Sequence, residues 1–318
     1  YGTQGANSVA LGYKSGENTQ DVYAIAIGDQ AGNSSQGSHS IAIGDQAGKT
    51  SQLTYSIAIG DQAGNANQKQ KNIAIGNQAG KSAQGKANTG DGGFSIAIGN
   101  AAGQTEQNEY SIAIGANAGN DTQFGSAIAI GRDAGKKSQQ IGTIAIGDQA
   151  GYGTQGTYSI ALGAQAGQYS QGWYAIAIGA GAGAGSDIID GLVGQGNYSI
   201  ALGSNCGNLK QGSDSVAIGR EAGKNNQSSD AISIGNYNSD SGNIGGGQLK
   251  QGQYSISIGR NSGSTDQSNN SIAIGNEAGK TSQGSKSVSI GNYYDSSDTS
   301  SHGQKNQGIS SVSLGDNA

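Results

Sequence analysis

Few residues in this sequence have the type and spacing that catalysis or metal binding requires. The two histidines, His39 and His302, lie far apart in the chain, and no cysteine and histidine together show the spacing of a zinc site. The single cysteine, Cys206, takes a position that alanine fills in most repeats of the chain, which favours a small buried thiol over a nucleophile. The sequence therefore predicts that the protein is not an enzyme and has no catalytic residue, no cofactor and no metal site.

Two further patterns have the outward form of ligand sites. Asp29, Asp45, Asp61 and Asp148 recur at one position of a repeat, as calcium ligands do, but the calcium-binding nonapeptide is missing and other residues fill the same position elsewhere. We interpret these aspartates as turn residues. The segment 151–156 matches the Gly-x-Gly-x-x-Gly pattern of dinucleotide sites, but no helix is expected after it, as such a site requires.

Composition limits the partners that the chain can have. Its 318 residues carry a formal net charge of -5, which gives no basic surface for nucleic acid. No apolar run approaches the roughly 18 residues of a membrane span, so we expect no insertion into a membrane. Only 33% of the residues are hydrophobic, but they recur at fixed spacing, which indicates a thin, repetitive core rather than disorder.

The tetrapeptide Ile-Ala-Ile-Gly, with close variants, recurs from one end of the chain to the other. Its 18 glycines are 16 residues apart in 13 of the 17 intervals, and a glutamine lies eight residues from nearly every one of them. A unit of 16 residues accommodates two short strands and two turns. The sequence predicts an all-β fold: a single parallel β-solenoid of about 18 coils of about 16 residues, continuous over residues 1–318.

Each motif strand alternates large and small side chains, which point to opposite faces of the strand. We expect the isoleucines inside the coil and the small residues outside. The predicted core ladder comprises Ile25, Ile27, Ile41, Ile43, Ile57, Ile59, Ile112 and Ile114. The glutamines predict an amide ladder along the solenoid, with solvated turn residues as the alternative. This ladder comprises Gln20, Gln36, Gln52, Gln68, Gln123 and Gln139.

The middle position of the motif strand holds only Ala or Ser, a restriction that indicates close packing against it. A neighbouring solenoid is the simplest partner, and the alternative is that coil geometry alone limits the size of the residue. The lateral interface candidates are Ala26, Ala42, Ala58, Ala74, Ala113 and Ala129. A second stripe, two residues before the first isoleucine, holds aromatic residues such as Tyr23 and Tyr55, which either bind sugars or a partner or cover a corner of the coil.

Four coils are longer than the rest. The extra residues lie near 85–93, 180–194, 236–250 and 292–306, and we expect them to form loops that project from the solenoid. Such loops either bind or pack against a partner or are passive decoration.

The runs Asn7-Ser-Val-Ala-Leu-Gly, Ser40-Ile-Ala-Ile-Gly and Ser215-Val-Ala-Ile-Gly resemble the head repeats of YadA-type trimeric autotransporter adhesins. Similar arrays are found in phage and giant-virus fibre proteins. The resemblance extends over the whole chain, although the 16-residue coil is longer than the usual adhesin repeat. It implies a left-handed parallel β-roll, usually in a homotrimer, on an extracellular surface.

Both ends of the sequence fall in the middle of a coil. We expect each end to complete a coil of the next copy, and the alternative is a segment cut from a longer solenoid. The candidates for this end-to-end interface are Tyr1, Gly2, Gln4, Leu314, Gly315 and Ala318.

The predicted function is that of a structural subunit of an extracellular filament or fibre, joined end to end and laterally. Its main partner is then another copy of itself, with a cell surface or a carbohydrate as a further partner, and its location is extracellular or on a cell or virion surface. The alternative is the head domain of a trimeric adhesin or viral fibre that binds a host surface. A minor alternative is an ice-binding solenoid.

Overall fold

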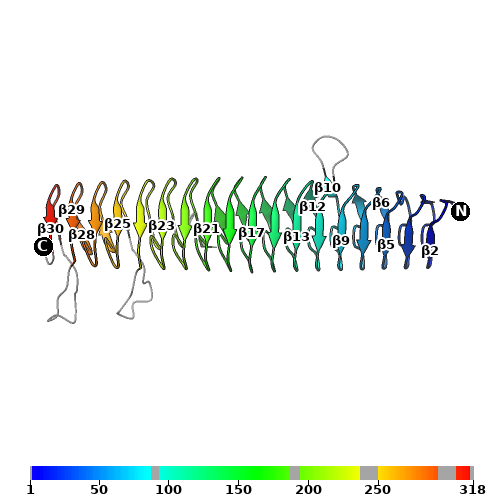
Figure 1. Ribbon diagram of the computed structural model, residues 1–318, viewed down its shortest axis with the longest axis horizontal. Coiled ribbons are helices and arrows are strands. Elements are labelled where there is room, and N and C mark those ends of the chain that lie inside the picture. Colours follow the sequence, from blue (N-terminus) through cyan, green and yellow to red (C-terminus); the bar gives the residue numbers. More distant parts are fainter. Residues whose placement is uncertain (1, 87–92, 187–193, 237–249, 293–305, 316–318) are drawn as a thin grey trace. The chain divides into compact units, whose positions relative to one another are not determined.

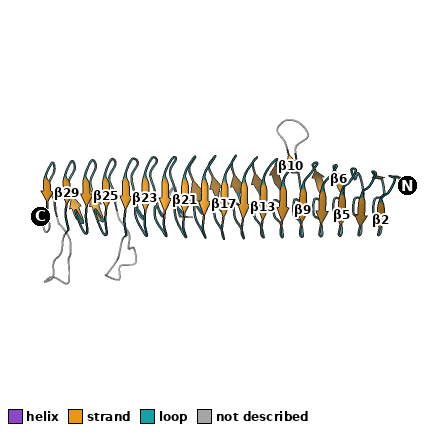
Figure 2. Ribbon diagram, viewed as in Figure 1, coloured by secondary structure: helices purple, strands orange, loops and turns teal. Residues whose placement is uncertain are grey.

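The computed structural model describes residues 2–86, 93–186, 194–236, 250–292 and 306–315. These residues form strands and turns and no helix (Figure 2). They fall into two compact units, Tyr1–Tyr158 and Ser159–Ala318. Each unit is a stack of parallel strands, with one isoleucine strand in every coil (Figure 1). The predicted fold class, an all-β parallel solenoid, is confirmed, whereas a single continuous domain over 1–318 stays a prediction.

The isoleucine-side sheet of the first unit contains one three-residue strand from each coil. Its strands are β2 (Val9–Leu11), β4 (Ile25–Ile27), β5 (Ile41–Ile43), β7 (Ile57–Ile59), β9 (Ile73–Ile75), β11 (Ile96–Ile98), β13 (Ile112–Ile114), β15 (Ile128–Ile130) and β17 (Ile144–Ile146). Equivalent positions pair, as Ala42 does with Ala58. The same register holds across the 23-residue interval, where Ala74 pairs with Ala97, so the extra residues leave the ladder intact.

The glutamine side of the first unit carries shorter strands. They are β1 (Thr3–Gln4), β3 (Thr19–Gln20), β6 (Thr50–Gln52), β8 (Ala66–Gln68), β10 (Gln84–Lys86), β12 (Glu106–Asn108), β14 (Thr122–Gln123), β16 (Ser138–Gln139) and β18 (Thr154–Gln155). Glutamine pairs with glutamine in successive coils, as Gln123 does with Gln139. A coil therefore has two strands and two turns, as the 16-residue spacing predicts.

The second unit repeats this plan with a weaker glutamine side. Its isoleucine-side strands are β19 (Ile160–Leu162), β21 (Ile176–Ile178), β22 (Ile200–Leu202), β23 (Val216–Ile218), β24 (Ile232–Ile234), β25 (Ile256–Ile258), β27 (Ile272–Ile274), β29 (Val288–Ile290) and β30 (Val312–Leu314). Its glutamine-side strands are β20 (Ser170–Gln171), β26 (Thr265–Gln267) and β28 (Thr281–Gln283). Between Gln171 and Gln267, successive coils pair on this side through single bridges between glutamines.

The glycines of the turn after the isoleucine strand are required by its geometry. Gly44 has a φ of 127°, and a Cβ there would lie 2.7 Å from the backbone of Gly60 in the next coil. Gly48 has a φ of 53°, and a Cβ there would lie 2.6 Å from Oε1 of Gln52. Left-handed backbone with no space for a Cβ is available only to glycine, which explains why both positions recur with the motif.

The interior of the coil is filled by small residues and glutamine, not by isoleucine. All six lateral interface candidates, Ala26, Ala42, Ala58, Ala74, Ala113 and Ala129, are 0% exposed. The isoleucines on either side of each alanine are only half-buried, with the same pattern in β4, β5, β7 and β13. The prediction that isoleucine lies inside and alanine outside is therefore wrong, and the Ala/Ser stripe is not an outer surface.

The glutamines explain this inversion. Each reaches into the coil from the opposite side, and the largest fully buried side chains of the described residues are all glutamines. A Cβ on Gly48 would lie 3.3 Å from Cβ of Ala42 as well as 2.6 Å from Gln52, so glutamine, glycine and alanine already touch. Because protein interiors are close-packed, no room is left for a larger side chain in the middle of the strand.

The predicted amide ladder is present, and its members are buried rather than solvated. Nε2 of Gln139 donates to the carbonyl of Ile128 at 2.9 Å and to Oε1 of Gln155 at 3.1 Å, and Oε1 of Gln139 accepts from Gln123 at 3.1 Å. The amide of Gln139 thus joins the glutamine side to the isoleucine strand and to the next coil. Burial of a polar group is tolerated because these hydrogen bonds replace those to water.

The ladder has gaps. Among the described residues, seven glutamines have a buried Oε1 atom that accepts no hydrogen bond. They are Gln20, Gln52, Gln107, Gln211, Gln227, Gln251 and Gln267. The last four come from consecutive coils of the second unit, in the part where the glutamine side pairs through single bridges. An unsatisfied buried acceptor costs about 1–3 kcal/mol, so this part of the ladder contributes less stability than its counterpart in the first unit.

Candidate interaction surface

The inversion places a continuous aliphatic stripe on the outside of each unit. We call it the isoleucine face: the first and third residues of every isoleucine-side strand. All of these positions hold Ile, Val or Leu in the described strands. Within each ladder the side chains are stacked on their equivalents in adjacent coils, which leaves them half-buried, and Leu162, Leu202 and Ile290 are each 41% exposed.

A face restricted to aliphatic residues is unusual for a surface in contact with water. Soluble monomers rarely expose a contiguous apolar patch of more than a few hundred Å², and larger patches mark contact with another molecule. Solvent would tolerate Lys, Glu or Thr at half-exposed strand positions. The isoleucine face is therefore the main candidate for a binding surface.

Aromatic residues lie along one edge of this face. We call their position the aromatic corner: the second residue before the first aliphatic residue of a strand. It holds an aromatic ring at Tyr23, His39, Tyr55, Phe94, Tyr110, Tyr158, Tyr174, Tyr198 and Tyr254. Rings stack on one another: Tyr23 and Tyr55 lie 5.0 and 5.1 Å from His39, and the Phe94 and Tyr110 centroids are 5.5 Å apart. Tyr174 and Tyr198 stack at 5.3 Å in the second unit.

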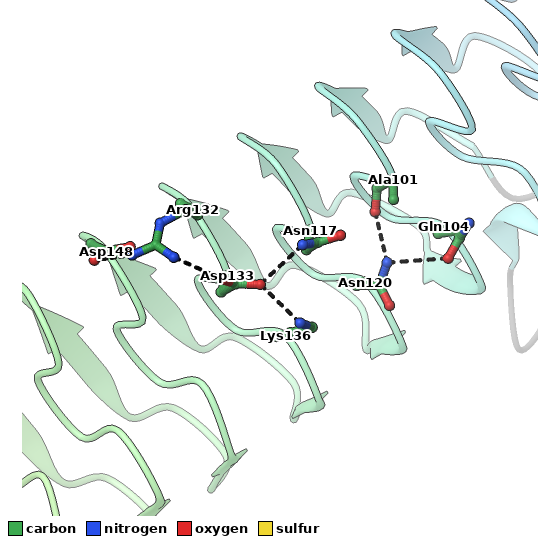
Figure 3. Close-up of polar contacts among 8 residues, drawn as sticks. All are labelled: Ala101, Gln104, Asn117, Asn120, Arg132, Asp133, Lys136 and Asp148. Atoms are coloured by element: carbon green, nitrogen blue, oxygen red, sulfur yellow. Dashed lines mark hydrogen bonds and ion pairs between the residues drawn. The ribbon is translucent and has the colours of Figure 1, made fainter.

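The turn at the other end of the isoleucine strand carries polar ladders (Figure 3). Asp133 is buried and accepts from Asn117 at 3.1 Å, with Nζ of Lys136 at 2.9 Å and a guanidinium nitrogen of Arg132 at 3.5 Å. Arg132 also pairs with Asp148 at 2.7 Å. Burial alone would raise the pKa of Asp133, but the hydrogen bonds from Lys136 and Asn117 and the nearby positive charges hold it below its usual value. These contacts tie successive coils together.

Two of the four aspartates that recur like calcium ligands, Asp61 and Asp148, make contacts with neighbouring coils instead. Asp61 accepts from Nδ2 of Asn77 at 2.8 Å, and Asp148 pairs with Arg132. Across the described ranges there is no group of three or more His, Cys, Asp or Glu residues that could hold a metal ion. The described residues also contain no helix with the length and apolar character that crossing a membrane requires.

Cys206 is a buried thiol, as its position in the repeat predicts. Its Sγ lies 3.1 Å from the carbonyl oxygen of Gly203. Burial raises the pKa of the thiol to about 12, so the nucleophilic thiolate is absent at neutral pH.

The remaining predicted sites are covered only in part. Most residues of the four insertions near 85–93, 180–194, 236–250 and 292–306 lie outside the described residues, as do Tyr1 and Ala318. The other end-to-end candidates, Gly2, Gln4, Leu314 and Gly315, are exposed, and their role in assembly stays a prediction. The isoleucine face was missed as a surface because strand alternation does not tell inside from outside.

One comparison with known proteins gives a match. The model of the YadA head domain repeat matches residues 251–278 in two copies. These residues include β25, β26 and β27, hence strands of both sides of the coil. Among curated proteins and solved structures, none matches the chain. The solenoid thus contains repeats of the YadA head domain type, the kind from which adhesin heads are built, and this confirms the resemblance seen in the sequence.

Proposed function

We propose that this chain is an adhesin-like head or fibre module of an extracellular surface, in which copies of the chain pack side by side through the isoleucine face. The observation that carries the proposal is the inversion of the strand: the small residues are buried and the aliphatic ones form a continuous outer stripe. To be covered, an outer stripe of this kind needs a partner with apolar side chains at matching positions. The match to the YadA head domain repeat supports a surface-exposed, homo-oligomeric module.

A second copy of the chain suits the face better than an unrelated partner. The isoleucine side chains recur at the strand spacing of about 4.8 Å, and a parallel copy repeats them at the same spacing. The stripes of neighbouring copies would interdigitate within each unit. Most soluble oligomers are closed and symmetric, and YadA-type head repeats imply a homotrimer, so a closed homotrimer is the arrangement we propose.

Substitutions that introduce positive charge on the isoleucine face test the proposal. We expect the 318-residue chain to have a mass in solution that is a multiple of 31.5 kDa, and the Ile112→Lys/Ile144→Lys variant to have the mass of a single chain. Both isoleucines are half-buried on the outer face, two coils apart, so a lysine at each is tolerated in a monomer and costly in an interface. An unchanged circular dichroism spectrum would show that the variant is folded.

The matched control places the same two charges on the other side of the coil. Thr122→Lys/Thr154→Lys alters strands β14 and β18, and we expect it to keep the wild-type mass. A wild-type protein that is a single chain at all concentrations would contradict the proposal. Equal masses for the wild type and both variants would contradict the assignment of the interface to the isoleucine face.

End-to-end assembly into a filament is a separate part of the proposal. Strands β2 and β30 each have one paired neighbour among the described strands. Further coils of a longer chain and a second copy of this chain would cover them equally well. Electron micrographs of the purified chain distinguish the two: filaments with a longitudinal repeat support end-to-end assembly, and isolated short particles argue against it.

A further inference from the structure

The aromatic corner has a backbone conformation that does not suit its residues. At Tyr23, Tyr55, Phe94, Tyr110, Tyr158, Tyr174, Tyr198 and Tyr254 the φ angle lies between 56° and 60°, in the left-handed region. Glycine and asparagine adopt this region most readily, whereas other residues are uncommon there. Asn7 and Asn270 occupy the same position in other coils, with a φ of 57° each. Aromatic residues at this corner therefore cost stability that asparagine would not.

Stacking of the rings within the chain offsets this cost in some coils but not in all. Tyr174 and Tyr198 are nearly parallel, with 5° between the ring planes. Tyr254 has Asp230 and Asn270 at the equivalent positions of the adjacent coils, and it stacks on no described ring. Tyr254 is 57% exposed. No ring stacking within the described chain offsets the left-handed conformation of Tyr254, and more than half of its surface remains open to another molecule.

The corner is continuous with the isoleucine face. Ser255 lies between Tyr254 and Ile256, and it is buried, with its hydroxyl donating to the carbonyl of Gly252 at 2.6 Å. Tyr254, in the turn before β25, is exposed, and Ile256 is half-buried on the outer face of the strand. Each coil with an aromatic corner thus has an exposed ring two residues before its first aliphatic residue on the isoleucine face.

We propose that the aromatic corner is the rim of the interface between copies, where the rings of one chain pack against the neighbouring chain. This inference rests on the proposed side-by-side assembly and names a second set of residues that determines it. Tyrosine suits such a position because its ring is apolar and its hydroxyl remains available for a hydrogen bond at the edge of the contact.

A second copy fits the stacked rings better than a sugar does. Sugars bind to the open faces of aromatic rings, whereas the faces within the Tyr23, His39 and Tyr55 stack cover one another. Tyr23 and Tyr55 are 54% and 58% exposed, so their edges and hydroxyls remain available to another molecule. Edges and hydroxyls pack well against the side chains of another protein, and in the proposed assembly that protein is the neighbouring chain.

The variant Tyr254→Asn tests the inference in the whole 318-residue chain. Asparagine removes the ring and suits the left-handed backbone, so the variant should fold at least as well as the wild type. We expect its dissociation constant for self-association, measured by sedimentation over a dilution series, to rise at least about tenfold, as for a tyrosine truncated in an interface. Tyr254→Phe should stay close to the wild type.

Tyr13→Asn is the matched control. Tyr13 is 68% exposed but lies after its strand rather than at the corner, and we expect its loss to leave self-association unchanged. An unchanged dissociation constant for Tyr254→Asn, in a wild type that assembles through the isoleucine face, would overturn this inference alone. A wild type that never assembles would overturn the proposed function and this inference with it.

A thiol at the corner gives an independent measurement. Cys206 is buried and its pKa is raised to about 12, so Tyr254→Cys would add the one readily reactive thiol among the described residues. We expect a thiol reagent to label Cys at this position in dilute, dissociated protein and to label it at least about tenfold more slowly in assembled protein. Equal labelling rates in the two states would show that the corner stays in solvent and would overturn the inference.

Discussion

Glutamine is the residue that determines the interior of each coil. A core is usually built from aliphatic side chains, and glutamine is mostly found at protein surfaces. Here it is buried in almost every coil because its amide donates to the carbonyl of an isoleucine strand and, in many coils, also to the next glutamine, as at Gln52. Its length lets one side chain fill the space between two sheets, which leaves only the volume of a methyl group opposite it.

Gln139→Ala tests this role of glutamine. The substitution opens a cavity, removes one of the acceptors of Nε2 of Gln123 and removes the bonds to Ile128 and Gln155. We expect the free energy of unfolding to fall by about 3 kcal/mol. Gln140→Ala, at the adjacent half-buried position, should change it by less than about 0.5 kcal/mol. Urea unfolding measures both, and equal losses would argue against a buried amide ladder.

The lowered pKa of Asp133 makes the stability of the folded chain depend on pH. Its pKa is lower in the folded chain than the usual value of about 3.9, so its contacts stabilise the folded state fully above that pH. The contribution is lost as the pH falls through the lower, folded value. Between roughly pH 5 and pH 2 the wild type should therefore lose more stability than Asp133→Asn. Thermal unfolding over this range measures the difference, and parallel curves would contradict the role given to Asp133.

At the scale of the strands, the two sides of the coil differ in how firmly they hold adjacent coils together. The isoleucine side pairs through three residues in every coil of both units. The glutamine side of the second unit pairs through one residue per coil between Gln171 and Gln267, and its amide ladder is broken there. Fewer ladder hydrogen bonds and unsatisfied amides make this side less stable than the glutamine side between Gln123 and Gln155 in the first unit.

Hydrogen exchange should reveal this difference. We expect the backbone amides of Gln211 and Gln227 to have lower protection factors than those of Gln123 and Gln139 in the first unit. The amides of strands β22, β23 and β24, which belong to the same coils as the weak glutamine side, serve as the internal control and should exchange slowly. Uniform protection on both sides of these coils would contradict the prediction.

The positions of the strands were predictable from sequence, but the inside of the coil was not. The spacing of Gly44 and Gly60 locates the turns, and the alternation in β5 and β7 locates the strands. Large and small side chains alternate along the strand in the same way whichever face is buried. The alternation alone therefore does not show which face lies inside. The larger side chains were expected inside, as in a globular core. The signal that could have corrected this was the glutamine, a large residue kept opposite a strand whose middle position never exceeds serine.

At the scale of the whole molecule, a single chain has too little apolar burial to be the complete structure. A single chain buries glutamine, alanine and serine and leaves its aliphatic residues half-exposed, so much of the apolar burial expected of a folded protein is still to be gained. The proposed side-by-side packing of copies would provide that burial. In the proposed homotrimer each chain would contribute one third of a shared hydrophobic core, with the aromatic corner at its rim.

The most direct test is the accessibility of the methyl groups to a soluble paramagnetic probe, measured by NMR in the wild type and in the single-chain variant Ile112→Lys/Ile144→Lys. Because alanine lies inside the coil, we expect the alanine methyl signals to stay sharp in both proteins. Isoleucine methyl signals should broaden strongly in the single-chain variant and stay sharp in the assembled wild type. Sharp isoleucine signals together with broadened alanine signals in the single chain would place isoleucine inside the coil and contradict the account.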